Sequence, residues 1–179
     1  TTYSQKYIKL TRNIILNDTL HWQYWDIHTP ANNWTAIGFS STNGFYGIFD
    51  GGGHTVSGIY ICTTNDYQGL FGYAEGSAIG NLGVIESLIK GGSYVGGIAG
   101  YSGSMISNCY NTGTIKGNAN VGGIAGRGNS YITNCFNTGI IAGTSDRIGG
   151  IAGFGSAKDC YNTGAVSGAG SVGGITGYL

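Results

Sequence analysis

The sequence predicts an all-β fold, a single-stranded parallel β-helix (β-solenoid) with about 25 residues per coil. The first observation is a hexapeptide, an apolar residue followed by Gly-Gly-Ile-Ala-Gly, at 95–100, 121–126 and 148–153, with VGGITG at 172–177. The second is a block, NCYNTG, NCFNTG or DCYNTG, that stays in step with the hexapeptide. Two motifs in register over one period indicate stacked units. Because parallel β connections are mostly right-handed, we expect a right-handed coil.

We expect three consecutive regions in one continuous domain. Residues 1–44 form an N-terminal strand, within 7–16, and an aromatic-rich cap region. Residues 45–94 form degenerate coils, with two strands around an Asp-Gly-Gly-Gly turn and a GLFGY segment that aligns with GIAGY of the first full repeat. Residues 95–179 form the regular repeats. About six coils spaced about 4.8 Å make a rod of about 30 Å.

Each regular repeat contains only short strand segments. In the first repeat these are residues 95–101, 105–110 and 114–116, each bounded by Gly, Ser or Asn. Helices of ten or more residues have no room between such turn formers. Short strands separated by turns, repeated at this period, are typical of one coil of a parallel β-helix.

Equivalent residues of successive coils are expected to stack as rows, because each coil pairs with the coils above and below. We expect an asparagine row at a corner with left-handed dihedrals, glycines that need positive φ, an aromatic row and an isoleucine row. These rows are Asn111, Asn137 and Asn162; Gly113, Gly139 and Gly164; Tyr110, Phe136 and Tyr161; and Ile98, Ile124, Ile151 and Ile175. Which rows point inward stays open, since Ile106 and Cys109 are three residues apart.

Three of the four cysteines, Cys109, Cys135 and Cys160, occupy one repeat position, and Cys62 stands apart. Stacking brings neighbouring Cα atoms to about 4.8 Å, within the range for a disulfide, although parallel side chains disfavour the required dihedral. A buried thiol row is the favoured interpretation, since buried Cys behaves as a small hydrophobe. An inter-coil disulfide and a metal site remain alternatives, the latter without a Cys-x-x-Cys pair or a nearby His.

Composition excludes several classes of protein. Eight basic and eight acidic residues cancel, so no basic stripe exists to neutralise phosphates, and we expect no nucleic-acid partner. No apolar run is long enough to insert in a membrane. The low charge and the abundance of Gly, Asn, Thr, Ser and Tyr resemble extracellular or cell-surface proteins. The absence of a leader-like start suggests a mature form or an excised piece.

Several segments together carry a resemblance to a known family. WTAIG at 34–38, FDGGGHTVSGIYI at 49–61, GLFGY at 69–73 and the two repeated blocks resemble the GLUG-motif repeats, over about residues 7–179. Such repeats occur in bacterial surface and adhesin-like proteins and in non-catalytic regions of immunoglobulin-A peptidase-like proteins. The resemblance implies a surface-exposed β-solenoid segment and carries over no catalytic residue, because the His-Glu-x-x-His motif of such peptidases is absent here.

We expect no catalytic residue, no metal site and no cofactor, and therefore no enzyme. The acidic residues occupy unrelated phases of the repeat. Asp50 and His54 make the one plausible local pair, but the better interpretation is a turn residue and a strand residue.

The N-terminal aromatic cluster is the most site-like feature of the sequence. Trp22, Tyr24, Trp25 and Trp34 include all three tryptophans of the chain. Exposed aromatic rings can stack on sugars or anchor a partner protein. The competing interpretation is a plug that covers the end of the solenoid.

The expected function is that of a structural or adhesive extracellular β-solenoid, acting as a surface spacer or as a subunit that stacks head to tail into a filament. The fourth hexapeptide lacks its NCYNTG partner, so the last coil is expected to be open, and open edges invite pairing. We expect it to pair with a second copy or with the remainder of a longer chain. The alternative is a carbohydrate- or host-protein-binding module that uses the N-terminal aromatic cluster.

Overall fold

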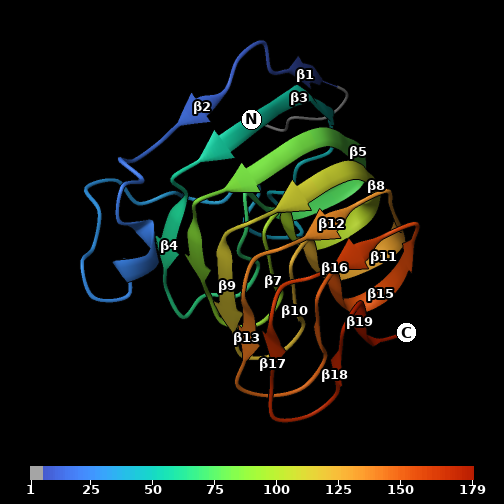
Figure 1. Ribbon diagram of the computed structural model, residues 1–179. Helices are drawn as coiled ribbons and strands as arrows, with labels where there is room; N and C mark the ends of the chain where they lie inside the picture. Colours follow the sequence, from blue (N-terminus) through green and yellow to red (C-terminus); the bar gives the residue numbers. More distant parts are fainter. Residues whose placement is uncertain (1–5) are drawn as a thin grey trace.

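A computed structural model describes residues 6–179 and shows an all-β parallel β-solenoid (Figure 1). The predicted fold class is confirmed. The solenoid has about five coils of roughly 27 residues, fewer and longer than expected from the sequence. The extra length lies in the early coils, where Ile48 pairs with Ala78 and Phe71 pairs with Ala99.

Three parallel sheets form the walls of the solenoid in the described residues. Sheet A contains β1 (Tyr7–Lys9), β3 (Ile48–Ser57), β5 (Phe71–Ile85), β8 (Ala99–Asn111), β11 (Ala125–Thr133), β15 (Ala152–Lys158) and β19 (Thr176–Tyr178), with β2 (Ile14–Ile15), β12 (Phe136–Asn137) and β16 (Tyr161–Asn162) alongside. Sheet B contains β4 (Tyr60–Cys62), β6 (Leu88–Lys90), β9 (Thr114–Gly117), β13 (Ile141–Gly143) and β17 (Val166–Ser167). Sheet C contains β7 (Val95–Gly96), β10 (Val121–Gly122), β14 (Ile148–Gly149) and β18 (Val172–Gly173).

The hexapeptide forms the corner between sheets C and A. Its apolar first residue and first glycine form the strand of sheet C, and its Ala-Gly or Thr-Gly opens the strand of sheet A. Val121 pairs with both Val95 and Ile148, so the copies stack in exact register. The isoleucine of each copy lies between the two strands and points into the core, where Ile98, Ile124 and Ile151 are fully buried.

The bend that reverses the side-chain alternation lies one residue before each cysteine. Asn108, Asn134 and Asp159 have φ between 51° and 54°, in the left-handed region that Asn and Asp tolerate. This bend lets Ile106 and Cys109 both point inward although they are three residues apart. The expectation of positive φ at Gly113, Gly139 and Gly164, and of left-handed dihedrals at the asparagine row, is therefore wrong.

Those three glycines serve a different purpose, which is close approach between coils. A Cβ at Gly139 would collide with the carbonyl oxygen of Gly113, and a Cβ at Gly164 would collide with that of Gly139. Only a residue without a side chain lets these turns stack at the spacing of the β ladder.

The core runs as one continuous cluster along the solenoid axis. Partly buried apolar residues cover it at the N-terminal end, among them Ile8, Leu10, Ile14 and Leu16. At the other end, Val172 and Ile175 are 44% and 36% exposed, although the equivalent residues of earlier coils are fully buried. The last described coil therefore leaves its apolar rows open.

The N-terminal regions differ from expectation in two places. The expected strand at 7–16 is two short strands, β1 and β2, which both pair with β3. The Asp-Gly-Gly-Gly segment does not separate two strands; it is an irregularity within β3, where the register with β5 shifts between Asp50 and His54. Gly52 and Gly53, with positive φ, allow this bulge.

Candidate functional site

The asparagine row forms a buried amide ladder. Asn111 Nδ2 donates to Asn137 Oδ1 at 2.7 Å, and Asn137 Nδ2 donates to Asn162 Oδ1 at 2.8 Å. Each asparagine also closes its own turn: Asn111 Nδ2 donates to the Gly113 carbonyl and Asn111 Oδ1 accepts from the Gly113 amide, both at 3.1 Å. The buried amides are thus satisfied within and between coils, which is an architectural role.

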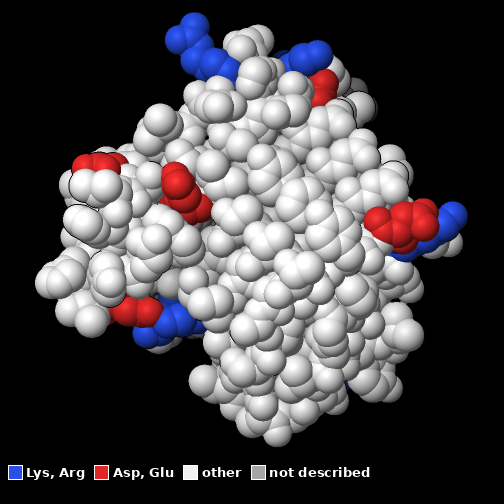
Figure 2. All heavy atoms as spheres, viewed as in Figure 1, with Lys and Arg blue, Asp and Glu red and all other residues white. Residues whose placement is uncertain are grey.

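The aromatic row Tyr110, Phe136 and Tyr161 lies outside the solenoid, next to the asparagine row. Successive ring centroids are 4.8 and 5.0 Å apart, and both pairs of planes are tilted by only 2°. Each ring therefore covers the face of the next one. Figure 2 shows few charged side chains on this face of the molecule.

The cysteine row points into the core. Cys109 and Cys135 are buried, Cys160 is partly buried, and all four cysteines are free thiols. The amide of Cys109 donates to Cys135 Sγ at 3.4 Å, and the amide of Cys135 donates to Cys160 Sγ at the same distance. A hydrogen bond with Cys135 and burial raise the pKa of the Cys109 thiol. Burial also raises the pKa of Cys160, whereas the hydrogen bond with Cys109 lowers that of Cys135. The row is therefore a hydrogen-bonded set of thiols in the core.

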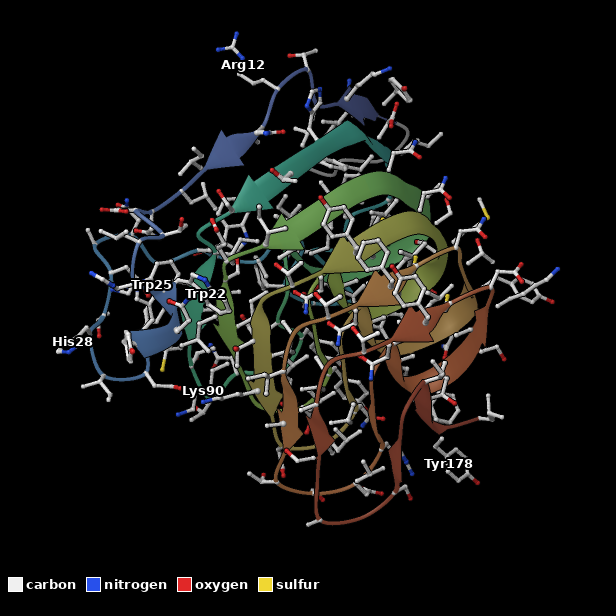
Figure 3. The ribbon with its side chains drawn as sticks, viewed as in Figure 1. Arg12, Trp22, Trp25, His28, Lys90 and Tyr178 are labelled. Carbon is white, nitrogen blue, oxygen red and sulfur yellow. The ribbon has the colours of Figure 1, made fainter. Side chains whose placement is uncertain are left out.

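The structure divides the N-terminal aromatic cluster into two parts. Trp25 is 5% exposed and makes an edge contact with Tyr60, with ring centroids 5.8 Å apart. Trp22 packs against the same group beside β4, at the 3₁₀ helix η1 (Trp22–Tyr24) (Figure 3). Asp26 pairs with Lys116 of β9, so this loop lies along the outside of sheet B. Its two tryptophans do not form the end plug that was one of the two interpretations, because they cover a side of the solenoid.

Trp34 lies elsewhere and does cover the end of the core. Its backbone amide donates to the Tyr60 carbonyl at 2.8 Å, and its indole Nε1 donates to the Leu70 carbonyl at 3.2 Å. It packs against the main core cluster. Tyr24, the fourth member of the cluster, is 59% exposed and has no contact with Trp34 among those that the structure shows. The four residues thus do not form one site.

Asp50 and His54 do not form a catalytic pair. Asp50 accepts hydrogen bonds from Asn81 Nδ2, the Gly52 amide and Tyr7 Oη at 2.9–3.0 Å, and these donors hold its pKa far below its usual range. His54 Nδ1 lies 3.3 Å from Asn13 Oδ1 instead. A carboxylate so strongly stabilised in its ionised form is a turn anchor and a poor general base.

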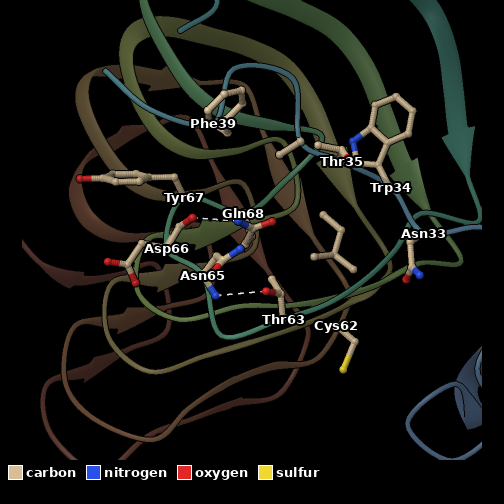
Figure 4. Close-up of a pocket in the computed structure, with 12 residues that line it drawn as sticks. Asn33, Trp34, Thr35, Phe39, Cys62, Thr63, Asn65, Asp66, Tyr67 and Gln68 are labelled. Atoms are coloured by element: carbon tan, nitrogen blue, oxygen red, sulfur yellow. Dashed lines mark hydrogen bonds between the residues drawn. The ribbon is translucent and has the colours of Figure 1, made fainter. Parts of the chain in front are cut away.

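A pocket that we did not predict opens between the N-terminal coil and the coil that follows it. We call it the Phe39–Tyr67 pocket; its volume is about 690 Å³. Figure 4 shows that its labelled side chains come from two segments, 33–39 and 62–68, that face each other. The lining residues are Asn33, Trp34, Thr35, Ala36, Phe39, Ile61, Cys62, Thr63, Asn65, Asp66, Tyr67 and Gln68. Of the predicted site residues, Trp34 alone lines it.

Tyrosine rings continue from this pocket along the solenoid. Tyr67 stacks on Tyr94, with centroids 5.0 Å apart and planes tilted by 8°, and Tyr73 stacks on Tyr101 at 4.4 Å and 10°. Burial raises the pKa of both Tyr67 and Tyr73, so their hydroxyls remain protonated donors. The sequence signal was present, since GLFGY and GIAGY both end in tyrosine, but nothing in the sequence placed the rings beside a pocket.

Other kinds of site find little support in residues 6–179. No group of three or more His, Cys, Asp or Glu side chains gathers there in a way that could hold a metal ion. In the same residues, no helix is long and apolar enough to cross a membrane.

Comparisons with known proteins place this geometry in context. Residues 91–116 match the model of the GLUG motif, as the resemblance of the sequence implied. The fold is similar to a crystal structure of a candidate immunoglobulin A1 protease from Bacteroides ovatus, with a TM-score of 0.79 and 26% identity. The match covers 99% of this chain and 56% of that one, so this chain spans little more than half the length of its structural relative. No curated protein sequence matches the chain.

Proposed function

We propose that this chain, a GLUG-motif solenoid similar to part of a larger protein, is a non-catalytic structural module on the outside of the cell. Its coils act as a spacer that is extended by pairing end to end with a further coil. The observation that carries this proposal is that the last described coil leaves its apolar rows exposed.

The last coil exposes the same rows that earlier coils bury. Val172 continues the row of Val95, Val121 and Ile148, and all three of these are fully buried, whereas Val172 is 44% exposed. Burying a side chain of this size stabilises a structure by about 1.5–3 kcal/mol. A further coil on β18 and β19 would add that burial together with a new β ladder.

A second copy of the chain or a continuation of the same polypeptide could supply the further coil. A second copy would place its N-terminal coil, where Tyr7 and Ile15 are exposed, against the last coil of the first. Such a head-to-tail contact uses two different surfaces, so it does not close on itself and produces a fibre.

Sedimentation over a broad concentration range tests stacking of copies. We expect the mean mass to rise with concentration and the Val172→Lys, Ile175→Lys double variant to stay monomeric. A matched variant, Tyr131→Lys with Ile140→Lys, adds the same charge to exposed apolar side chains on the lateral walls and should still associate. Monomers of the unmodified chain at every concentration would exclude stacking of copies.

A lengthened chain tests whether a continuation of the same polypeptide can form the further coil. We expect a copy of residues 156–178 added after Leu179 to raise the urea midpoint of unfolding, because it buries Val172 and Ile175. An unchanged midpoint would contradict the proposal that this coil accepts another.

The non-catalytic part of the proposal is supported by the positions of the acidic residues. Asp50 holds a turn and pairs with Lys9. Asp26 forms an ion pair with Lys116, and Asp146 forms one with Arg147. Incubation with immunoglobulin A1 followed by electrophoresis should leave both immunoglobulin chains intact. Cleavage of immunoglobulin A1 by the purified chain would overturn this assignment.

The extracellular part is supported by composition, chiefly by 9% charged residues and by the abundance of Gly, Asn, Thr, Ser and Tyr. An antibody against the solenoid should label intact cells that produce it. Labelling that requires permeabilised cells would contradict an external location.

Binding of a carbohydrate or host protein through the N-terminal aromatic cluster is the alternative. The buried position of Trp25 weakens it, because a ring packed on Tyr60 offers no face to a ligand. Tyr24→Ala is the variant that isolates this alternative, since Tyr24 is the exposed member of the cluster.

A further inference from the structure

The Phe39–Tyr67 pocket has the dimensions of a small-molecule site. Its volume of about 690 Å³ lies within the range of about 300–1,000 Å³ that is usual for ligand pockets. It lies at a junction between two segments, 33–39 and 61–68, that differ from the regular repeats. Repetition of the solenoid therefore does not require it.

Two aromatic side chains border the pocket and are available to a ligand. Phe39 is 59% exposed, and Figure 4 shows its ring on the same side of the pocket as that of Tyr67. Tyr67 is the first ring of its stack and lines the pocket: one face lies on Tyr94, and the Tyr73 ring meets it at 74° with centroids 5.7 Å apart. A flat apolar group on the opposite face of Tyr67 would extend the Tyr94–Tyr67 stack by one layer.

Tyr67 lies at a corner that is left-handed in successive coils. Its φ is 59°, and the equivalent residues Tyr94, Asn120 and Arg147 have φ of 60°, 52° and 61°. The repeated corner sets Tyr67 in register with Tyr94, on whose ring it stacks.

The polar groups of the pocket are held in place, and all of them except Asp66 are neutral. The amide of Asn65 donates to Thr63 Oγ1 at 3.2 Å, and Gln68 Nε2 donates to the Asp66 carbonyl at 2.8 Å (Figure 4). The amide of Ser93 donates to Asp66 Oδ1 at 2.7 Å, which ties this carboxylate to the next coil. Asn33 and Thr35 line the pocket from the other segment. A preorganised wall loses little entropy when a ligand binds.

The charge of the pocket limits the chemistry of its occupant. None of the described lining residues is Lys, Arg or His, and Asp66 is the one acidic residue among them. Phosphates, sulfates and acidic sugars would meet a carboxylate without a cation to offset it. A quaternary ammonium ion would need an aromatic cage, but Trp34 packs on the core and leaves only two available rings.

We propose that the Phe39–Tyr67 pocket binds a neutral saccharide. One sugar ring sits with its apolar face on Tyr67 beside Phe39, and its hydroxyl groups bond to Asp66 and Asn65. The site goes beyond the structural role proposed above and does not depend on whether coils stack, because it lies at the N-terminal end.

A glycan array followed by titration calorimetry tests the site. We expect the intact 179-residue chain to bind at least one neutral oligosaccharide on the array. With that oligosaccharide, Phe39→Ala and Asp66→Asn should each weaken the affinity about tenfold or more, at unchanged melting temperature. Tyr24→Ala is the matched control, because Tyr24 is as exposed as Phe39, and it should bind normally.

Three results would overturn the proposal: no neutral glycan bound on the array, a choline or acidic-glycan preference, or normal binding by Phe39→Ala. A loss of binding on Tyr24→Ala alone would assign the ligand to the N-terminal cluster instead. The sedimentation experiment is independent of these results, so failure of the structural proposal and failure of this one can be distinguished.

Discussion

At the scale of single residues, the fold depends on asparagines that have two different duties. Those in the buried row bond their own turn and the next coil, whereas those before each cysteine supply the left-handed bend. The two kinds lie three residues apart in NCYNTG, and the sequence alone does not distinguish their duties. Both are uncharged turn formers, so we assigned the bend to the wrong one.

Replacing Asn137 by Ala should destabilise the solenoid by about 3 kcal/mol, because it leaves buried partners on Asn111 and in its own turn unsatisfied. Urea unfolding measures the change. Thr138→Ala is the control at the adjacent exposed residue and should cost no more than about 0.5 kcal/mol. Equal losses for the two variants would show that the ladder is not a source of stability.

Asp50 should make stability depend on pH in the acid range. Hydrogen bonds from Asn81, Gly52 and Tyr7 lower its pKa in the folded state, so its contribution is present above the unfolded pKa of about 3.9 and is lost as the pH falls below it. Asp50→Asn should therefore lower the urea midpoint at pH 7, and the difference from the unmodified chain should shrink below about pH 4. A difference that is independent of pH would contradict this assignment.

At the scale of elements, close contact between turns is as important as strand pairing. The glycine of NCYNTG has no left-handed dihedral to provide, yet each copy sits against the carbonyl of the copy before it. Side-chain volume between stacked turns would force the strands on either side apart. The glycine and asparagine of this turn therefore act together, one by size and the other by hydrogen bonds.

Gly139→Ala should lower the free energy of unfolding by about 1–3 kcal/mol, because the new methyl group overlaps the Gly113 carbonyl. Gly174→Ala is the matched change, since a Cβ at that position meets no atom within 4 Å. It should be neutral within about 0.5 kcal/mol in thermal or urea unfolding. A tolerated Gly139→Ala would mean that the turns can separate without loss.

At the scale of the whole molecule, periodicity predicted most of the fold and little of the candidate site. The register of the repeats follows from the sequence because residues such as Val95, Val121 and Ile148 recur at one position and pair directly. The Phe39–Tyr67 pocket follows from how an irregular N-terminal segment packs on the second coil, and no period reports that contact. The same irregularity placed Trp25 on a side wall and Trp34 at the end of the core.

The inter-coil hydrogen bonds have a mechanical consequence. They run along the solenoid axis, and Figure 1 shows β1 and β19 at opposite ends of the stack. A force that pulls the ends apart therefore loads the coils in series and peels them off singly. Each released coil of roughly 27 residues would lengthen the chain by roughly 90 Å. Single-molecule pulling should show extension in steps of that size, and one abrupt rupture would contradict it. In a protein tethered to a surface, such a stack would unfold one coil at a time under force and refold when the force decreases.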